Sequence, residues 1–181
     1  MRHRDDKVLI PLLKDPATRR EAFEELVEMY SSRLYWLIRR MVISHEDTND
    51  ILQDTFVQAW MNLHQFRADS KLSTWLFKIA INGALNLLNH RQELITIDHL
   101  DMDFTNYLES DPYFDGEGTA IVLQKAILSL PEKQRLIFNM RYFEDMKYED
   151  ISEILNISVG AVKSSFHIAT EKIKAYIQIK Y

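Results

Sequence analysis

The sequence predicts an all-α protein built from two small helical domains. Glycine and proline occur only four times each in 181 residues, whereas residues that favour helices are abundant. Apolar residues recur at intervals of three and four along most of the chain, which is the spacing of one buried helix face. This spacing is interrupted over residues 92–118. We therefore expect two helical units joined by a linker, with 46% hydrophobic residues to supply their cores.

The N-terminal domain, assigned to residues 19–91, is expected to contain three helices. The first covers residues 19–42, the second runs from about Asp47 to Leu63, and the third begins at Ser73. Asp47 and Thr48 carry oxygens that can accept a backbone N–H, so they are expected to cap the second helix. The spacing places these apolar residues on one side of that helix: Leu52, Phe56, Ala59, Trp60 and Leu63.

The interruption at residues 92–118 is strongly acidic. It holds eight Asp and Glu residues and no Lys or Arg, and Pro112, Gly116 and Gly118 lie near its end. The rest of the chain therefore carries a net charge of +3, although the whole chain carries −5. This composition is typical of a linker. At the other end of the N-terminal domain, residues 1–18 are assigned to a lead-in.

The C-terminal domain, residues 119–181, is expected to end in a helix-turn-helix. Helical spacing resumes at Ala120 and stops at Pro131, and a further helix follows. The chain then predicts two helices, from Tyr148 to Leu155 and from Val159 onward, with only residues 156–158 between them. Two helices joined by so tight a turn, the second capped by Ser158, are typical of this DNA-binding unit.

A helix-turn-helix lays its second helix in the major groove of DNA, with the N-terminal residues of that helix toward the base edges. If Val162, Phe166 and Ala169 point inward, these residues lie on or beside the outer face: Ala161, Lys163, Ser164, Ser165, His167 and Ile168. Gly160 would let the backbone approach a phosphate near the helix N-terminus. An ordinary helical hairpin with a solvated face is the alternative, because Lys163 is the only Lys or Arg from residue 156 to residue 170.

The second helix of the N-terminal domain carries four polar residues on one face: Asn49, Asp50, Gln53 and Asp54. Two carboxylates at this spacing could bind a metal ion or act as an acid–base pair. More often such residues form a solvated face. The neighbouring sequence favours a third interpretation, a surface that binds another protein.

Three stretches of the chain resemble, in order and spacing, the sigma-70 family of RNA polymerase initiation factors. The first is Asp-Ile-Leu-Gln-Asp-Thr-Phe at residues 50–56, followed by Ala59-Trp60. The second contains Phe-Arg-Ala-Asp-Ser at residues 66–70 and Leu-Ser-Thr-Trp-Leu at residues 72–76. The third begins with Leu-Pro-Glu-Lys-Gln-Arg at residues 130–135 and includes the predicted recognition helix. The resemblance covers about residues 19–91 and 119–177, and it is to the compact extracytoplasmic-function (ECF) subfamily.

The resemblance implies that residues 19–91 are sigma region 2 and residues 119–181 are sigma region 4. The face formed by Asn49, Asp50, Gln53 and Asp54 would bind the clamp of core RNA polymerase. A loop and a stripe on the third helix would melt and capture the minus-ten promoter element: Arg67, Asp69, Ser70, Lys71, Lys78, Asn82, Asn86 and Asn89. The recognition helix and its surroundings would contact the minus-thirty-five element: Tyr148, Ser158, Gly160, Ala161, Lys163, Ser164, Ser165, His167 and Ile168.

The resemblance also implies partners. These are core RNA polymerase, through its clamp and flap regions, promoter DNA, and an anti-sigma factor. It implies neither a cofactor nor a metal ion. The negative charge of the chain is compatible with this function, because a factor that meets DNA inside a larger complex need not neutralise every phosphate by itself.

Two other classes of function explain less of the sequence. A one-component regulator with a ligand-binding N-terminal domain would account for residues 119–181, but not for the motifs at residues 50–76. An enzyme or a metal protein is disfavoured because the six histidines are scattered and cysteine is absent. No apolar run approaches the ~20 residues that cross a bilayer, and no secretory signal is recognisable, so we expect a cytoplasmic protein without membrane insertion.

Overall fold

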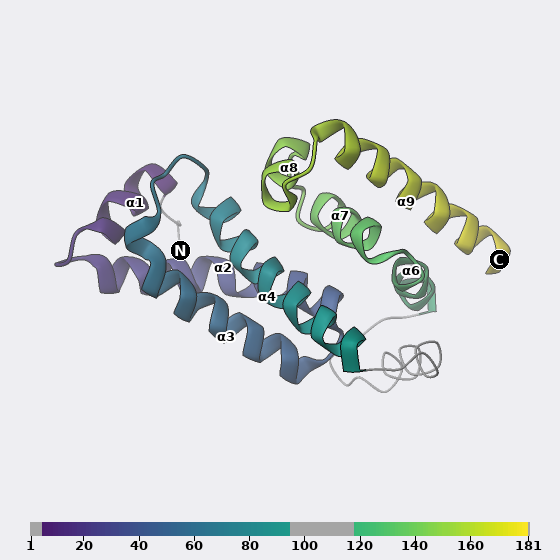
Figure 1. The fold of residues 1–181 in the computed structure, drawn as a ribbon, viewed down its shortest axis with the longest axis horizontal. Coiled ribbons are helices and arrows are strands. Elements are labelled where there is room, and N and C mark those ends of the chain that lie inside the picture. Colours follow the sequence, from purple (N-terminus) through teal and green to yellow (C-terminus); the bar gives the residue numbers. More distant parts are fainter. Residues whose placement is uncertain (1–4, 95–117, 181) are drawn as a thin grey trace. The chain divides into compact units, whose positions relative to one another are not determined.

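The computed structural model describes residues 5–94 and 118–180, and within these ranges every regular element is a helix. The all-α fold class predicted from the sequence is therefore confirmed. The chain divides into two compact units, residues 1–91 and residues 92–181. Each unit is a separate helical assembly, drawn in purple to teal and in green to yellow in Figure 1. The acidic segment predicted to be a linker lies, apart from its two ends, outside the described residues.

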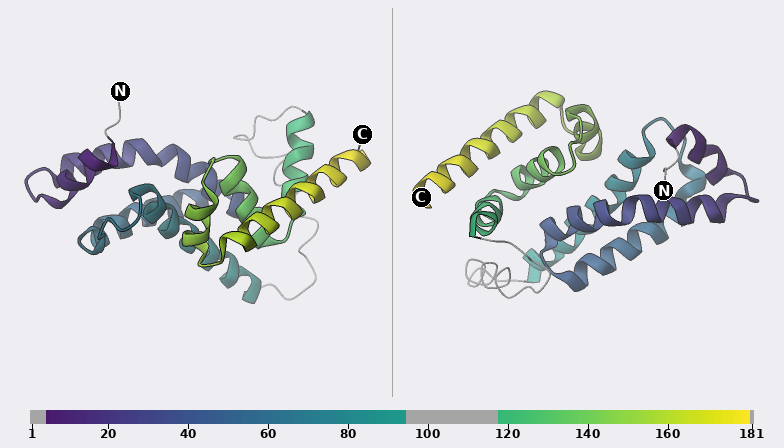
Figure 2. Two further views of the ribbon diagram at one scale, coloured as in Figure 1. Left: turned by 90° about the horizontal axis from the view of Figure 1, so that it is seen from above. Right: turned by 180° about the vertical axis from the view of Figure 1, so that it is seen from behind.

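The first unit consists of four α-helices and one short 3₁₀ helix. These are α1 (Asp6–Lys14), α2 (Arg19–Val42), α3 (His45–Asn62), η1 (Leu63–Gln65) and α4 (Leu72–Leu94). Helices α2 and α3 run side by side, as both views of Figure 2 show. Only Ile43 and Ser44 separate them, and Ile43 takes a left-handed backbone angle (φ 66°) that reverses the chain.

The N-terminus of α3 corrects the caps expected from the sequence. Ser44 is the N-cap, and its side chain accepts the backbone N–H of Asp47 at 3.3 Å. Asp47 and Thr48 thus lie inside the helix rather than at its cap. Thr48 is fully buried and its hydroxyl donates to the carbonyl of Ser44 at 2.6 Å, which satisfies a polar group in the core.

Helix α1 was not expected, because residues 1–18 were assigned to a lead-in. Leu9 and Leu13 are 0% and 1% exposed, and the helix packs on α2. Pro11 is the sixth of its nine residues, so it removes one backbone N–H from inside the helix. The apolar stretch at residues 8–13 is too short for its spacing to predict a helix. Only the burial of α1 against α2 shows that this segment belongs to the fold.

The buried side of α3 is also displaced from the one expected. The buried residues of this helix are two threonines, an isoleucine and an alanine: Thr48, Ile51, Thr55 and Ala59. Trp60 was expected on this side but is 44% exposed, with its ring packed edge-on against Phe23 at a centroid distance of 5.0 Å. A purely apolar criterion overlooks the two threonines, whose hydroxyls bond to carbonyls four residues earlier.

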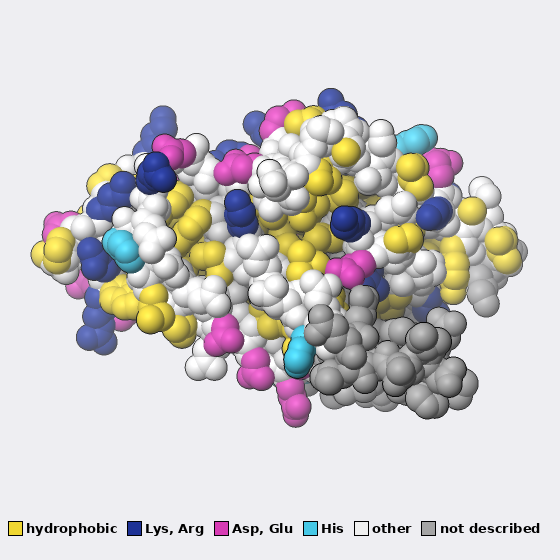
Figure 3. All heavy atoms as spheres, in the orientation of Figure 1, with side chains coloured by type: hydrophobic (Ala, Val, Ile, Leu, Met, Phe, Trp, Pro, Cys, Tyr) yellow, Lys and Arg dark blue, Asp and Glu magenta, His cyan; other side chains and the backbone are white. Residues whose placement is uncertain are grey.

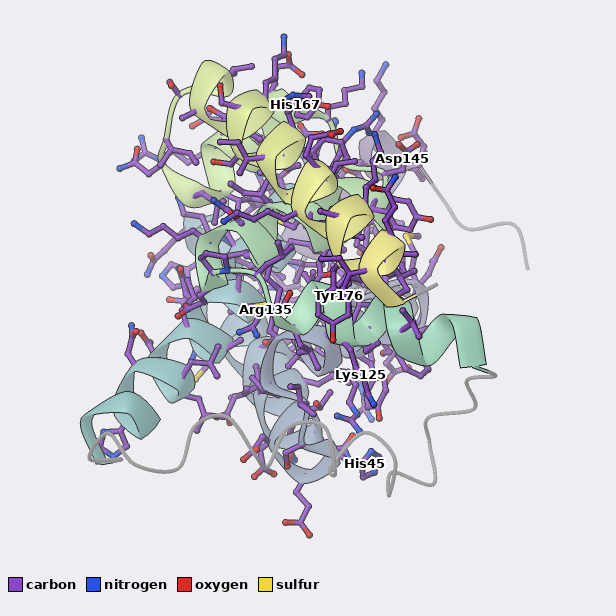
Figure 4. All side chains as sticks on the ribbon, turned by 90° about the vertical axis from the view of Figure 1, so that its right-hand side faces the viewer. His45, Lys125, Arg135, Asp145, His167 and Tyr176 are labelled. Carbon is purple, nitrogen blue, oxygen red and sulfur yellow. The ribbon has the colours of Figure 1, made fainter. Side chains whose placement is uncertain are left out.

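The second unit consists of α6 (Gly118–Leu128), α7 (Glu132–Tyr142), α8 (Tyr148–Leu155) and α9 (Val159–Lys180). Its core includes the following residues of α6, α7 and α9 and of the turn after α6: Ala126, Ile127, Leu130, Phe138, Ala169 and Ile173. Helix α9 contacts all three other helices of the unit, and Figure 4 shows Tyr176 on its C-terminal half beside α6. The recognition helix is therefore the N-terminal half of a long helix whose C-terminal half packs in the core.

Candidate functional site

The four polar residues predicted on one face of α3 are all exposed: Asn49, Asp50, Gln53 and Asp54. They lie opposite the line of threonines that faces the core. Acidic side chains gather along this edge of the first unit in Figure 3, over α3. The predicted common face therefore exists as an accessible surface with two carboxylates.

A groove of about 220 Å³ runs beside this face, between α3 and α4. Asp50 and Asp54 line it together with apolar groups of α4, among them Ile79 and Leu87. The two helices approach closely because Gly83 has no side chain; a Cβ there would lie 3.3 Å from Ile51 Cγ2. The sequence did not predict this groove.

Asn49 is connected to helix α2 through the side chain of a histidine. Its side-chain nitrogen lies 3.0 Å from His45 Nε2, and His45 Nδ1 lies 2.8 Å from the Tyr35 hydroxyl. His45 is the first residue of α3, so this chain of contacts links α2 to the start of the acidic face. Asn49 is thus the most constrained of the four predicted residues.

The loop between η1 and α4 carries the residues predicted to meet the minus-ten element. Arg67, Asp69 and Lys71 are exposed, and Ser70 is half-buried. Ala68 has a positive φ of 64°, which turns the chain between them. The loop is flanked by buried residues, because Phe66 and Leu72 are 6% and 0% exposed. The exposed polar side chains of the loop therefore lie between two buried residues.

Helix α4 continues this surface as a stripe of four exposed residues: Lys78, Asn82, Asn86 and Asn89. Ile81, next to Asn82 in sequence, is 1% exposed and belongs to the core. The amides on the stripe can both donate and accept hydrogen bonds. The stripe thus has the polarity that contact with bases and sugar–phosphate backbone requires.

The helix-turn-helix has the bounds that the sequence predicts. Helix α8 ends at Leu155, and α9 begins at Val159. Ser158 Oγ accepts the N–H of Ala161 at 3.2 Å, so it caps the recognition helix as predicted. Val162 and Ala169 are fully buried and Phe166 is partly buried against the core. A Cβ at Gly160 would make only an ordinary van der Waals contact, with Ser158 Oγ at 4.0 Å.

The outer face of α9 is exposed at five predicted positions and half-buried at one. The exposed ones are Ala161, Lys163, Ser164, His167 and Ile168, whereas Ser165 is half-buried. Figure 4 shows His167 on the N-terminal half of the helix. Ile168 is 45% exposed although it is apolar, so it is available for contact with a thymine methyl group.

Tyr148, at the start of α8, joins two cations. Its ring lies 5.2 Å from the guanidinium carbon of Arg141 and 5.7 Å from Lys163 Nζ, measured to the ring centroid. Arg141 also donates to Asp145 Oδ1 at 2.7 Å and to the Met146 carbonyl at 3.0 Å, which holds the turn between α7 and α8. Arg141 was not predicted from the sequence, although its spacing of four from Asp145 is a recognisable signal.

Comparison with known proteins identifies the family. The model of "Sigma-70 region 2" matches residues 26–93, and that of "Sigma-70, region 4" matches residues 120–173. The ECF RNA polymerase sigma-E factor of Haemophilus influenzae is 30% identical over 169 residues, which are 88% of this chain and 89% of the relative. The chain belongs to the ECF RNA polymerase sigma factors.

Other relatives support the same assignment. The ECF sigma factor SigW of Bacillus subtilis is 29% identical over 87% of this chain and 90% of its own length. Among solved structures, the sigma factor CnrH in complex with the cytosolic domain of CnrY has the same fold, with a TM-score of 0.72 at 22% identity over 97% of this chain and 99% of the other. The sigma factor RpoE of Bartonella quintana, in complex with the anti-sigma factor NepR, gives a TM-score of 0.70 at 21% identity over 88% and 98%.

This sigma factor is a transcription initiation factor that depends on core RNA polymerase, and not an enzyme. A one-component regulator is not favoured, because the region 2 match spans the N-terminal unit that such a regulator would use for a ligand. Within the described residues, no three His, Asp or Glu side chains are grouped so that they could hold a metal ion. None of the described helices is long and apolar enough to span a membrane.

Proposed function

We propose that three separate surfaces of this sigma factor carry out polymerase binding, minus-ten melting and minus-thirty-five recognition. The α3 face of Asn49, Asp50, Gln53 and Asp54 binds the polymerase clamp. The loop at residues 67–71 and the α4 stripe engage the minus-ten element. The outer face of α9, with Tyr148, reads the minus-thirty-five element, and the second unit also meets the polymerase flap.

One observation supports this assignment above the others. Polar or charged side chains are exposed on each of the three surfaces, while most of the apolar residues between them in sequence are buried. On α3, for example, Asp50 and Asp54 are exposed and Ile51 and Thr55 are buried. Carboxylates held on a rigid helix can pair with basic groups of a partner, and such pairs determine register and association rate.

Two further proposals rest on the relatives. A solved structure with this fold contains an anti-sigma factor, NepR, bound to its sigma factor, and we extend this type of partner to the present chain. A factor that acts with core polymerase and promoter DNA works where these are found, which places this protein in the cytoplasm.

The α3 assignment is tested by reversing one charge. Asp54→Arg should lower affinity for core polymerase by roughly a hundredfold or more, because an attractive contact is replaced by repulsion at a desolvated interface. Glu28→Arg, an equal charge reversal at an exposed position of α2, is the matched control. Binding is measured by competition for fluorescently labelled core enzyme, and circular dichroism verifies that both variants fold. Unchanged affinity of Asp54→Arg, or equal loss in both variants, contradicts the assignment.

The promoter is identified by transcription from a genomic DNA library with core polymerase, in the presence and absence of the protein. Sequencing of the transcript starts should reveal initiation sites that require the protein and share two upstream elements. Starts that are identical with and without the protein would contradict the proposed function.

A further inference from the structure

Helix α1 holds the loop that precedes α4. The carboxylate of Asp6 accepts the backbone N–H of Leu72 at 3.1 Å, across 66 residues of sequence. Helix α1 also contacts η1, the short helix before the loop. The anchors of α1 are Leu9 and Leu13, which are 0% and 1% exposed. Asp6 therefore contacts α4 from a helix that is itself packed in the core of the first unit.

The bonded N–H belongs to the first residue of α4. The first four N–H groups of an α-helix have no partner within the helix and need one from elsewhere. The residue before α4 is Lys71, whose side chain has donors but no acceptor. A carboxylate at this position also interacts favourably with the positive end of the helix dipole. Asp6 thus caps α4 from a distant part of the chain.

Tyr30 of α2 joins the same contact. It is 6% exposed, and its hydroxyl donates to the Asp6 carboxylate and accepts from Ser73. Burial in the first place, and the negative charge of Asp6 in the second, raise the pKa of Tyr30 above its ordinary value. Helices α1, α2 and α4 therefore meet at the end of the loop through one carboxylate.

The other end of the loop is fixed by an aromatic contact. The rings of Phe66 and Trp75 lie 5.1 Å apart, and Phe66 is 6% exposed. Between these two anchors, Arg67, Asp69 and Lys71 project into solvent. The conformation of the loop is thus determined at both ends, and Asp6 supplies the C-terminal anchor.

We infer that Asp6 is a positioning residue for the minus-ten loop: from α1 it fixes the start of α4, and through it the loop that captures single-stranded DNA. This inference rests on the proposed function of the loop. It assigns to the N-terminal helix a part in promoter melting, although that helix carries none of the residues proposed to touch DNA.

The test compares Asp6→Ala and Asp6→Asn with the parent in the full chain. Asparagine keeps an oxygen that can accept the Leu72 N–H, whereas alanine removes it. Asp5→Ala is the matched control, because Asp5 is the exposed neighbouring carboxylate and its side chain caps no helix N–H of α1. Hydrogen exchange of the Leu72 amide is read first. Asp6→Ala should accelerate it by at least about tenfold, since an N-terminal amide of a helix has no other acceptor within the helix.

The second readout uses holoenzyme assembled from each variant and a single-stranded oligonucleotide of the non-template minus-ten strand. Asp6→Ala should weaken capture of this strand by roughly fivefold, the loss expected from a missing helix cap. Asp6→Asn should restore most of the capture, and Asp5→Ala should behave as the parent. Affinity for core polymerase should be the same in all four proteins.

Three results overturn the inference. The first is unchanged hydrogen exchange of the Leu72 amide in Asp6→Ala, and the second is faster exchange without weaker capture of the strand. The third is a loss of affinity for core polymerase as large as the loss of strand capture, which would indicate general unfolding of the first unit. Failure of the proposed function is recognised separately, because then the parent holoenzyme itself does not capture the strand. Leu72 exchange would still show whether Asp6 holds the loop.

Discussion

The turn between α8 and α9 and the loop between η1 and α4 both precede helices proposed to contact DNA, but they are stabilised in different ways. In the turn, Ser158 caps its own helix at 3.2 Å and Ser152 Oγ donates to the Ile157 carbonyl at 2.5 Å. In the loop, the helix start is capped by Asp6, 66 residues away. The turn is therefore determined by its own sequence, and the loop by the packing of another helix.

This difference has a consequence for the effects of substitution. At the turn, the cap comes from Ser158 itself, so exchanging exposed residues elsewhere should not move the recognition helix. Around the loop, a residue remote in sequence affects the surface presented to DNA.

Within the second unit, the largest effect is expected at Ile168 of the recognition helix. Ile168→Asp should reduce transcription that depends on the minus-thirty-five element by roughly thirtyfold or more, because it replaces an apolar contact with a charge that phosphates repel. The helix should remain folded, since Ile168 is 45% exposed. Ile179→Asp on the same helix, where isoleucine is 85% exposed, is the control. Normal initiation by Ile168→Asp would mean that another face of α9 meets DNA.

An intermediate effect is expected at Tyr148. Tyr148→Ala should weaken minus-thirty-five-dependent transcription by about fivefold, because Lys163 loses the ring that orients its ammonium group. Tyr148→Phe keeps the ring and should retain most activity apart from contacts of the hydroxyl. Lys163→Ala should have a similar effect, and the double variant should be no worse than the stronger single variant. Additive losses would show that Tyr148 and Lys163 act separately.

A smaller effect, on stability, is expected at Ser158. Ser158→Ala should lower the free energy of unfolding of the second unit by about 1 kcal/mol, the usual cost of losing a helix N-cap. Ser164→Ala, at an exposed position inside the same helix, should be neutral or slightly stabilising since alanine favours helices. Chemical denaturation followed by circular dichroism measures both. Equal stabilities of Ser158→Ala and the parent would imply that this cap does not stabilise the second unit.

The smallest effect is expected at Asn82 on the α4 stripe. Asn82→Ala should stabilise the first unit by about 0.5 kcal/mol, because Asn is a poor helix former. Opening of duplex promoters should nevertheless fall by roughly two- to threefold, with little change on templates already melted. Permanganate footprinting of unpaired thymines provides the measurement, and Asn86→Ala should be milder. Equal melting by Asn82→Ala and the parent would indicate that the stripe is merely solvated.

Much of the fold was predictable because its determinants are periodic or local. Helix α2 begins and ends at the predicted residues 19 and 42, and the bounds of the helix-turn-helix were predicted as well. The proposed contact residues were selected by spacing or by the resemblance to the family, and nearly all are exposed; Ser70, Tyr148 and Ser165 are half-buried. Their roles at the polymerase and the promoter stay predictions until the substitutions above are measured.

The errors share one cause. The caps Asp47 and Thr48, the buried Trp60 and the assignment of residues 1–18 to a lead-in were all inferred from residue type and spacing alone. Ser44 became the cap because Ile43 reverses the chain directly before it, and Thr48 and Thr55 entered the core because local carbonyls accept their hydroxyls. Residue type by itself does not reveal which neighbours will satisfy a polar group.

The sequence by itself thus determined the all-α class, the order of the helices, the turn before the recognition helix and the family, because each depends on spacing or on contacts within a few residues. The tertiary structure decided the rest. It placed α1 in the first unit, closed α3 on α4 at Gly83, and brought Asp6 to the start of α4. These are contacts between distant segments, and their partners are selected by which surfaces must be buried together, which no local pattern encodes.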